Sequence, residues 1–345
     1  MEAAVRLAEI EAAEFIRGWQ LPMFNRYDLA FRHLGYPMDS IYSELKLDTS
    51  LFSSLMSGVD ARAVLSIFRK IEAKTGDSCL GAKLGLLRQP KTLGSRFYIA
   101  LFSQNLREAL EDFFFESALR MPFLKMKLVE SSNQMSAEFE FTFDDPAISY
   151  EVDIDILTLV SLIREVLHYQ DWKPARVLVK HRLEPERRQL MESKLGCSIE
   201  SDSECNAVVI SEEYTRNTLP WFDLSAKKIM LNAHRSELAQ MFGDYGAAMR
   251  TKYFFARYFE YKGSVPSVEE AADYFSWSLS TYNRELRREG AHFRALRNEF
   301  IYRVAEGLLE LNYPAEKVAN IFAYRHKAVF TRFIKGHEQT FSQEK

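Results

Sequence analysis

Hydrophobic and polar positions follow two different periods along this chain, and the period predicts where strands and helices lie. Between residues 124 and 143 apolar side chains alternate with polar ones, which predicts two strands joined by a polar turn at 131–134. Shorter apolar runs predict further strands at 175–180 and 206–211. Helical spacing predicts helices at 1–17, 27–35, 61–75, 105–117, 154–168 and 184–195. This irregular order of helices and strands predicts an α+β fold for the N-terminal part.

From about residue 235 onward only the helical period remains, which predicts an all-α C-terminal part. Residues 236–261 are rich in aromatic side chains, and Lys262-Gly263-Ser264-Val265-Pro266 marks the boundary after them. We therefore expect a regulatory domain at 1–235, a helical linker at 236–263 and a second domain at 264–345. Two interpretations of the aromatic linker stay open: packing onto its own domain, and a contact with another domain or a second copy.

The second domain contains two pairs of short helices. The first pair begins at Ser267, which forms a capping-box signature with Glu270 three residues later. After a break at 276–277, Ser278 is an N-cap candidate, and Gly290 is placed to end the second helix. The same order recurs at 314–322 and 326–335, with a long helix at 293–308 between the pairs. The sequence therefore predicts two helix-turn-helix motifs in tandem.

The second helix of each pair carries the side chains that suit DNA. Asparagine can form two hydrogen bonds with adenine and arginine with guanine, whereas further basic and hydroxyl side chains suit phosphates. The first of these helices, taken alone, fits a solvated amphipathic helix equally well. Its repetition about 47 residues later favours a pair of recognition helices. The candidate DNA-binding residues are Ser280, Asn283, Arg284, Arg287, His326, Lys327, Thr331, Arg332 and Lys335.

About 70 residues of this region resemble the AraC/XylS-type transcription regulators. The matching motifs are Ser267-Val268-Glu269-Glu270-Ala271-Ala272, Ser278-x-x-Thr281-Tyr282-x-Arg284-x-Leu286, Gly290-x-x-Phe293-x-x-Leu296, Val318-Ala319-x-x-Phe322 and Val329-Phe330-x-Arg332. The resemblance implies that the two recognition helices enter successive major grooves, about 34 Å apart along the DNA. By position it implies base contacts from Ser280, Asn283, Arg284, Lys327, Thr331 and Arg332.

The chain departs from that family at several positions. Ser276 and Ala323 stand where the family usually has glycine in the turn of each motif. A left-handed backbone conformation there strains a non-glycine residue by about 1–2 kcal/mol. Further departures are Ile301 at an often basic position of the linking helix, and Gln339 and Ser342 in place of a closing glycine and proline. A second hypothesis follows: an interaction protein of regulator ancestry whose DNA binding is weakened.

The N-terminal part is similar to the arabinose-binding type of ligand-sensing domain found in one branch of the same family. The resemblance covers roughly residues 25–220 and rests on Thr75-Gly76-Asp77, Leu80-Gly81-Ala82-Lys83-Leu84-Gly85, Asp171-Trp172-Lys173-Pro174, Leu195-Gly196-Cys197 and Asn206-Ala207-Val208. It implies that this domain responds to a small effector. No charge cluster in the segment indicates the chemical class of that effector.

Composition and charge narrow the class of protein. The net charge is −3, and residues 262–345 carry 13 basic and 11 acidic side chains, so DNA affinity must depend on where the charges lie. Three cysteines, Cys79, Cys197 and Cys205, are too few for a disulfide framework and indicate a reducing compartment. The most apolar run is too short and too charged to cross a membrane, so we expect a cytoplasmic protein.

Signatures of enzymes are missing from the sequence. It has no GxSxG, Walker A, HExxH or GxGxxG motif, and its histidines and cysteines lack metal-ligand spacing. We therefore expect no catalytic residues, no metal and no cofactor. The expected partners are double-stranded DNA and an unidentified small effector, with RNA polymerase and a second copy of the chain left open.

Overall fold

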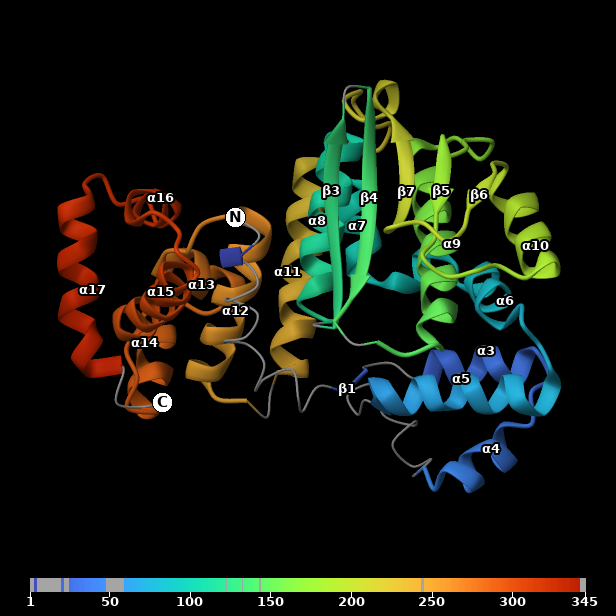
Figure 1. Cartoon of the computed structure of the whole chain (residues 1–345), viewed down its shortest axis with the longest axis horizontal. Helices are drawn as coiled ribbons and strands as arrows, with labels where there is room; N and C mark the ends of the chain where they lie inside the picture. Colours follow the sequence, from blue (N-terminus) through green and yellow to red (C-terminus); the bar gives the residue numbers. More distant parts are fainter. Residues whose placement is uncertain are drawn as a thin grey trace. The chain divides into compact units, whose positions relative to one another are not determined.

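The computed structural model describes residues 3–4, 20–21, 25–47, 59–121, 123–131, 133–142, 144–242 and 245–341. The chain divides into two compact units, which are described separately (Figure 1). One unit spans Trp19–His234, and the other spans Arg235–Lys345 together with Met1–Gly18. The helix predicted at 1–17 lies outside the described residues except for Ala3 and Ala4, and Ser342 lies outside them too.

A mixed five-stranded sheet forms the centre of the Trp19–His234 unit, with strand order β3-β4-β7-β5-β6. The predicted hairpin is confirmed: Leu124 pairs with Phe141, and Ser131 with Gln134, in antiparallel register. The pairs β4–β7 and β5–β7 are also antiparallel, whereas β5–β6 is parallel. The strands are β3 Leu124–Ser131, β4 Gln134–Phe141, β5 Arg176–Leu178, β6 Ile199–Glu200 and β7 Asn206–Ser211. The two-residue strand β6 was not predicted.

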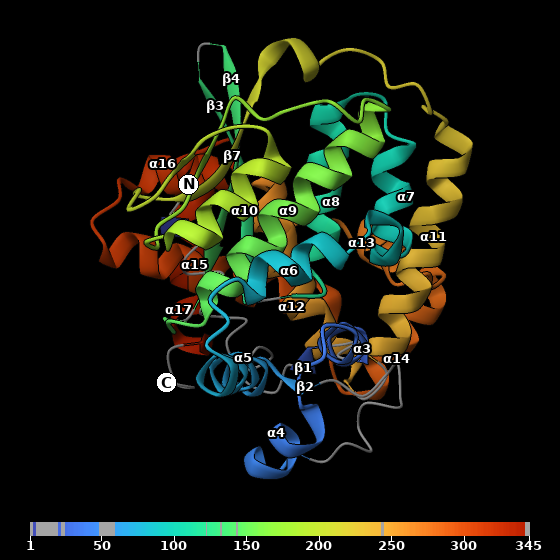
Figure 2. The ribbon, with the colours of Figure 1, turned by 90° about the vertical axis from the view of Figure 1, so that its right-hand side faces the viewer.

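Helices of the same unit cover one face of this sheet (Figure 2). The helix α9, Ile148–Leu167, has buried residues on several sides because it lies between the sheet and further helices. The other helices that lie wholly within this unit are α3 Asn25–His33, α4 Met38–Leu45, α5 Ala61–Thr75, α6 Leu80–Leu87, α7 Ser95–Leu101, α8 Leu106–Ala118 and α10 Pro185–Leu195, of which α3, α4 and α5 lie beyond the end of the sheet (Figure 1). Short elements complete it: β1 Gln20–Leu21, β2 Val59–Asp60, and the 3-10 helices η2 Pro90–Leu93 and η3 Glu212–Tyr214. The α+β fold class predicted for this part is confirmed.

Every secondary-structure element in the described residues of the Arg235–Lys345 unit is a helix, beginning with the end of α11, Leu224–Met241. The aromatic residues of α12 form its core: Phe255 lies against Phe300, and Phe259 lies against both Phe300 and Phe322. The rings of Phe255 and Phe259 therefore pack within their own unit, which is the first of the two interpretations of the aromatic segment. The helices are α12 Ala247–Lys262, α13 Val268–Tyr274, α14 Leu279–Arg288, α15 Phe293–Glu310, α16 Ala315–Ile321 and α17 Lys327–Phe341.

Two details of the last helix differ from the sequence-based expectation. The helix α17 continues to Phe341, whereas the prediction ended it at Lys335. Val329, whose apolar side chain suggests the buried side of this helix, is 50% exposed. The buried side is set by Phe330, and successive helical residues are turned by about 100°, so the preceding Val329 points away from the core. Among the described residues, no helix is long and apolar enough to span a membrane.

Candidate nucleic-acid interface

The first helix-turn-helix motif is α13 and α14. The capping box is present: Glu270 N donates to Ser267 Oγ at 3.1 Å, and Ser267 N donates to Glu270 Oε2 at 2.7 Å. At the other end of α13, Ser276 N bonds to Asp273 O and the next amide, of Trp277, bonds to Ala272 O, both at 2.9 Å. This reversed pair of hydrogen bonds is a Schellman motif, which requires a left-handed residue directly after the helix cap. Ser276 takes that conformation, with φ of 56°.

The second motif, α16 and α17, has the same turn. Ala323 N bonds to Asn320 O at 3.0 Å, and Tyr324 N bonds to Ala319 O at 2.9 Å. Ala323 has φ of 57°, so both positions where the family usually has glycine take the left-handed conformation. The substitutions therefore keep the turn and leave each motif with a strained residue.

The two recognition helices can be matched residue by residue. The left-handed residues Ser276 and Ala323 are 47 positions apart, whereas the buried aromatics Tyr282 and Phe330 are 48 apart. The second turn thus contains one more residue before its helix begins. The residue of α17 equivalent to Ser280 is therefore Ala328. A constant repeat of 47 residues makes Lys327 the equivalent, which is wrong by one position.

Contacts from the neighbouring helix α12 hold α14 in place. The phenol of Tyr282 is fully buried and hydrogen-bonded to Thr251 Oγ1 at 2.6 Å. Burial raises the pKa of Tyr282, so this hydroxyl stays protonated. Directly after α14, the carboxylate of Glu289 accepts hydrogen bonds from Ala247 N at 2.6 Å and Ala248 N at 3.0 Å. Glu289 therefore caps α12 and fixes the C-terminal end of the first recognition helix.

The exposed face of α14 carries three of the four predicted side chains. Ser280, Arg284 and Arg287 are exposed, on the side away from Tyr282. Asn283 is half-buried, and its amide nitrogen donates to Leu279 O at 3.0 Å, so it must change rotamer to reach a base. Arg288, which was not among the predicted site residues, is also exposed, and its spacing of four from Arg284 places both on one helical face.

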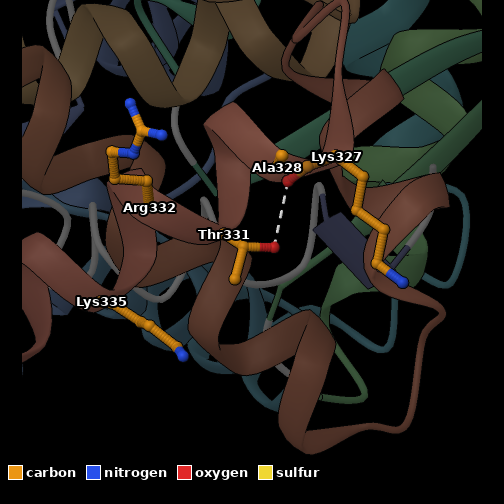
Figure 3. Close-up of a pocket in the computed structure, with 5 residues that line it drawn as sticks. All are labelled: Lys327, Ala328, Thr331, Arg332 and Lys335. Carbon is orange, nitrogen blue, oxygen red and sulfur yellow. Dashed lines mark hydrogen bonds between the residues drawn. The ribbon is translucent and has the colours of Figure 1, made fainter.

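The corresponding face of α17 forms a shallow hollow (Figure 3). Thr331 Oγ1 donates to Lys327 O at 3.0 Å, which holds its side chain along the helix. Arg332 and Lys335 are exposed, and within the described part of the chain neither they nor Lys327 has an ion-pair partner. The residues that line the hollow are Lys327, Ala328, Thr331, Arg332 and Lys335.

His326 lies at the start of α17 and not on its outward face. Its carbonyl oxygen accepts hydrogen bonds from Val329 N and Phe330 N, as the residue before a helix does. The imidazole is exposed, which suits a contact at the edge of the interface. The exposed Val329 adds an apolar group to the exposed surface of α17. In DNA, an apolar side chain can contact the methyl group of thymine in the major groove.

In the Trp19–His234 unit a cleft lies where β4 and β5 end and β7 and α9 begin. It measures about 590 Å³, within the range of small-molecule sites. Lys180 and His181 line one part and Glu140 and Asp144 another, so the cleft offers both signs of charge. Beneath it His181 Nε2 lies 3.3 Å from the buried carboxylate of Asp153. Among the described residues, no cluster of side chains that could hold a metal ion is present.

A second polar cluster lies inside the same unit. The hydroxyl of Tyr27 donates to Glu151 Oε2 at 3.0 Å, and Arg88 lies 3.6 Å from Asp155. Burial, and then the charge of Asp155, raises the pKa of Glu151. Beside this cluster Arg88, Arg96 and Asp155 line an enclosed cavity of about 20 Å³, which is room for one water molecule. The larger cleft is therefore the better candidate for a ligand.

Comparisons with known proteins identify the family of the chain. A family model described as the arabinose-binding domain of AraC transcription regulator, N-terminal, matches residues 35–219. Among solved structures the chain is similar to the crystal structure of transcriptional regulator CdpR from Pseudomonas aeruginosa, at 15% sequence identity and a TM-score of 0.45, covering 87% of this chain and 93% of that chain. No curated protein matches the sequence. Because the family model covers more than half of its residues, the chain belongs to the AraC-type transcription regulators that carry this N-terminal domain.

Proposed function

We propose that this protein is a sequence-specific DNA-binding transcription regulator, and that residues 264–345 are its DNA-binding domain. The observation that carries the proposal is the equivalence of the two recognition helices. Each turns a buried aromatic side chain inward, Tyr282 or Phe330, and an exposed arginine outward two positions later, Arg284 or Arg332. A repeated helix of this kind suits two successive major grooves of one duplex.

The chemistry of the outward faces suggests a division of roles. Arg284 and Arg332, exposed at equivalent positions of the two helices, are assigned to guanine contacts. Arg287 and Lys335, each three positions further along and also exposed, are assigned to phosphate contacts. Ser280, Asn283, His326, Lys327 and Thr331 complete the proposed interface.

The N-terminal unit is proposed to sense a small effector. The match to a ligand-binding family domain supports this part, and the cleft near Lys180 and Asp144 supplies a site of suitable size. A regulator of this kind acts on chromosomal DNA in the cytoplasm, and RNA polymerase and a second copy of the chain are its further proposed partners. The alternative of an interaction protein with weakened DNA binding rested on Ser276, Ala323, Gln339 and Ser342. Of these, Ser276 and Ala323 keep the left-handed turn of the motif.

The experiment is equilibrium binding of the full-length protein to a labelled duplex of its own promoter region. A scrambled duplex of equal composition is the control, and both are measured at 50, 100 and 200 mM salt. We expect tighter binding to the promoter duplex, and a logarithmic salt slope of about −0.9 for each phosphate contacted. Equal affinity for the two duplexes, or no binding at 50 mM salt, contradicts the proposal.

A further inference from the structure

The two recognition helices differ in how their basic side chains are paired. On α17, the described part of the chain provides no ion-pair partner for Lys327, Arg332 or Lys335. On α14, Glu285 pairs with two of the three exposed arginines, Arg284 and Arg288. Its Oε1 lies 3.4 Å from Arg284 Nε, and its Oε2 lies 2.9 Å from Arg288 Nη1.

The environment of Glu285 keeps its carboxylate at this place. The Glu285 side chain is 22% exposed, whereas those of Arg284 and Arg288 are 69% and 78% exposed. The two arginine side chains are therefore free to swing toward DNA, and the carboxylate stays at the side of the helix. On α17 the counterpart of Glu285, 48 positions later, is the uncharged and half-buried Phe333. Only the first recognition helix thus carries a negative charge beside its outward arginine.

A carboxylate at this position has two consequences for DNA binding. It repels every phosphate within the Debye length, about 10 Å at 0.1 M salt, whatever the sequence of the duplex. It can also accept a hydrogen bond, and the N4 amino group of cytosine is a base-edge donor that aspartate and glutamate accept in the major groove. When Arg284 turns toward a base, the Glu285 carboxylate loses its contact with Arg284. A hydrogen bond from a cytosine amino group then replaces that contact.

We propose that Glu285 is a specificity-determining residue of the first recognition helix. It lowers affinity for DNA in general and favours half-sites that place a cytosine amino group within its reach. On α17 the two exposed lysines, Lys327 and Lys335, supply affinity that does not depend on sequence, beside the base contact proposed for Arg332. This inference rests on the proposed function of DNA binding.

The test is Glu285→Gln in the full-length protein, which keeps the shape of the side chain and removes its charge. The matched control is Glu269→Gln, because Glu269 is exposed at the start of α13 and has no ion pair within the described residues. Both variants and the wild type are titrated with the promoter duplex and the scrambled duplex across salt. Thermal melting checks that each variant is folded.

We expect Glu285→Gln to bind the scrambled duplex about three- to fivefold more tightly than the wild type does, because one exposed ion pair contributes a free energy of this size. Its salt slope steepens by about 1 because a released arginine gains a phosphate. The ratio of promoter to scrambled affinity falls, and replacing cytosines in the half-site under α14 weakens the variant less than the wild type. In the half-site under α17, replacing cytosines weakens binding of the variant and of the wild type equally. The affinity of the control Glu269→Gln stays within about twofold of the wild-type affinity.

The outcomes separate this inference from the proposed function. If the wild type binds the promoter duplex and Glu285→Gln has the same scrambled affinity, salt slope and base preference, the role of Glu285 is refuted and DNA binding stands. If the wild type shows no binding at 50 mM salt, the proposed function fails, and the role of Glu285 fails with it. An equal gain in affinity for Glu269→Gln refutes a role specific to α14.

Discussion

The left-handed alanine in the second turn allows a sharp test of how the motif is held. Ala323 has φ of 57° and lies on the surface, so its methyl group contributes little packing. An L-residue in this conformation is strained by about 1–2 kcal/mol, which glycine avoids. Glycine in turn loses about 0.5–1 kcal/mol more conformational entropy on folding. We therefore expect Ala323→Gly to raise the free energy of unfolding by about 0.5–1 kcal/mol.

The assay is thermal melting of the full-length protein, followed through the transition of the C-terminal unit. For a domain of about 100 residues, a gain of this size corresponds to a rise in Tm of about 2–6 °C. The matched control is Ala328→Gly, because Ala328 is equally exposed but lies within α17. Ala328 lies in the first turn of α17, where glycine costs up to the roughly 1 kcal/mol of a helix interior, so this control should not raise Tm. A decrease in Tm for Ala323→Gly refutes the strain argument.

Two further predictions concern the DNA contacts and the buried acids. Arg284→Ala and Arg332→Ala should each relax base preference by about 1–3 kcal/mol. Arg287→Ala and Lys335→Ala should instead weaken binding to all sequences alike and reduce the salt slope by about 1. Identical behaviour of the two pairs of variants in binding isotherms contradicts the division of roles. Because the pKa of Glu151 is raised in the folded protein, its contribution to stability is complete below its ordinary pKa and is lost as pH rises through the raised value. Glu151→Gln keeps an acceptor for the Tyr27 hydroxyl. We expect the Tm of this variant minus the Tm of the wild type to be larger at pH 8 than at pH 5. The same Tm difference at both pH values refutes burial as the cause.

Local chemistry explains which features the sequence could predict. The capping box of Ser267 and Glu270 depends on residues three positions apart, and the structure has it. The positions of the turns at Ser276 and Ala323 followed from the spacing of the motif and its resemblance to a family, whereas their left-handed conformation is seen only in the structure. The hairpin of β3 and β4 followed from alternation along adjacent segments.

Features that depend on distant or side-chain contacts could not be predicted. The strand β6 is two residues long and is defined by its parallel partner β5. The extra residue in the second turn was hidden because His326 has no capping side chain, unlike Ser278 in the first motif. The pairing of Glu285 with Arg284 and Arg288 depends on rotamers, which spacing alone does not give.

The most direct measurement of the central claim is a hydroxyl-radical footprint of the full-length protein on its own promoter region. Two recognition helices in successive major grooves predict two protected patches on one face of the duplex, about one helical turn apart. Arg332→Ala should weaken one patch and Arg284→Ala the other. Protection confined to a single groove, or no protection above that on a scrambled duplex at 50 mM salt, would contradict the account.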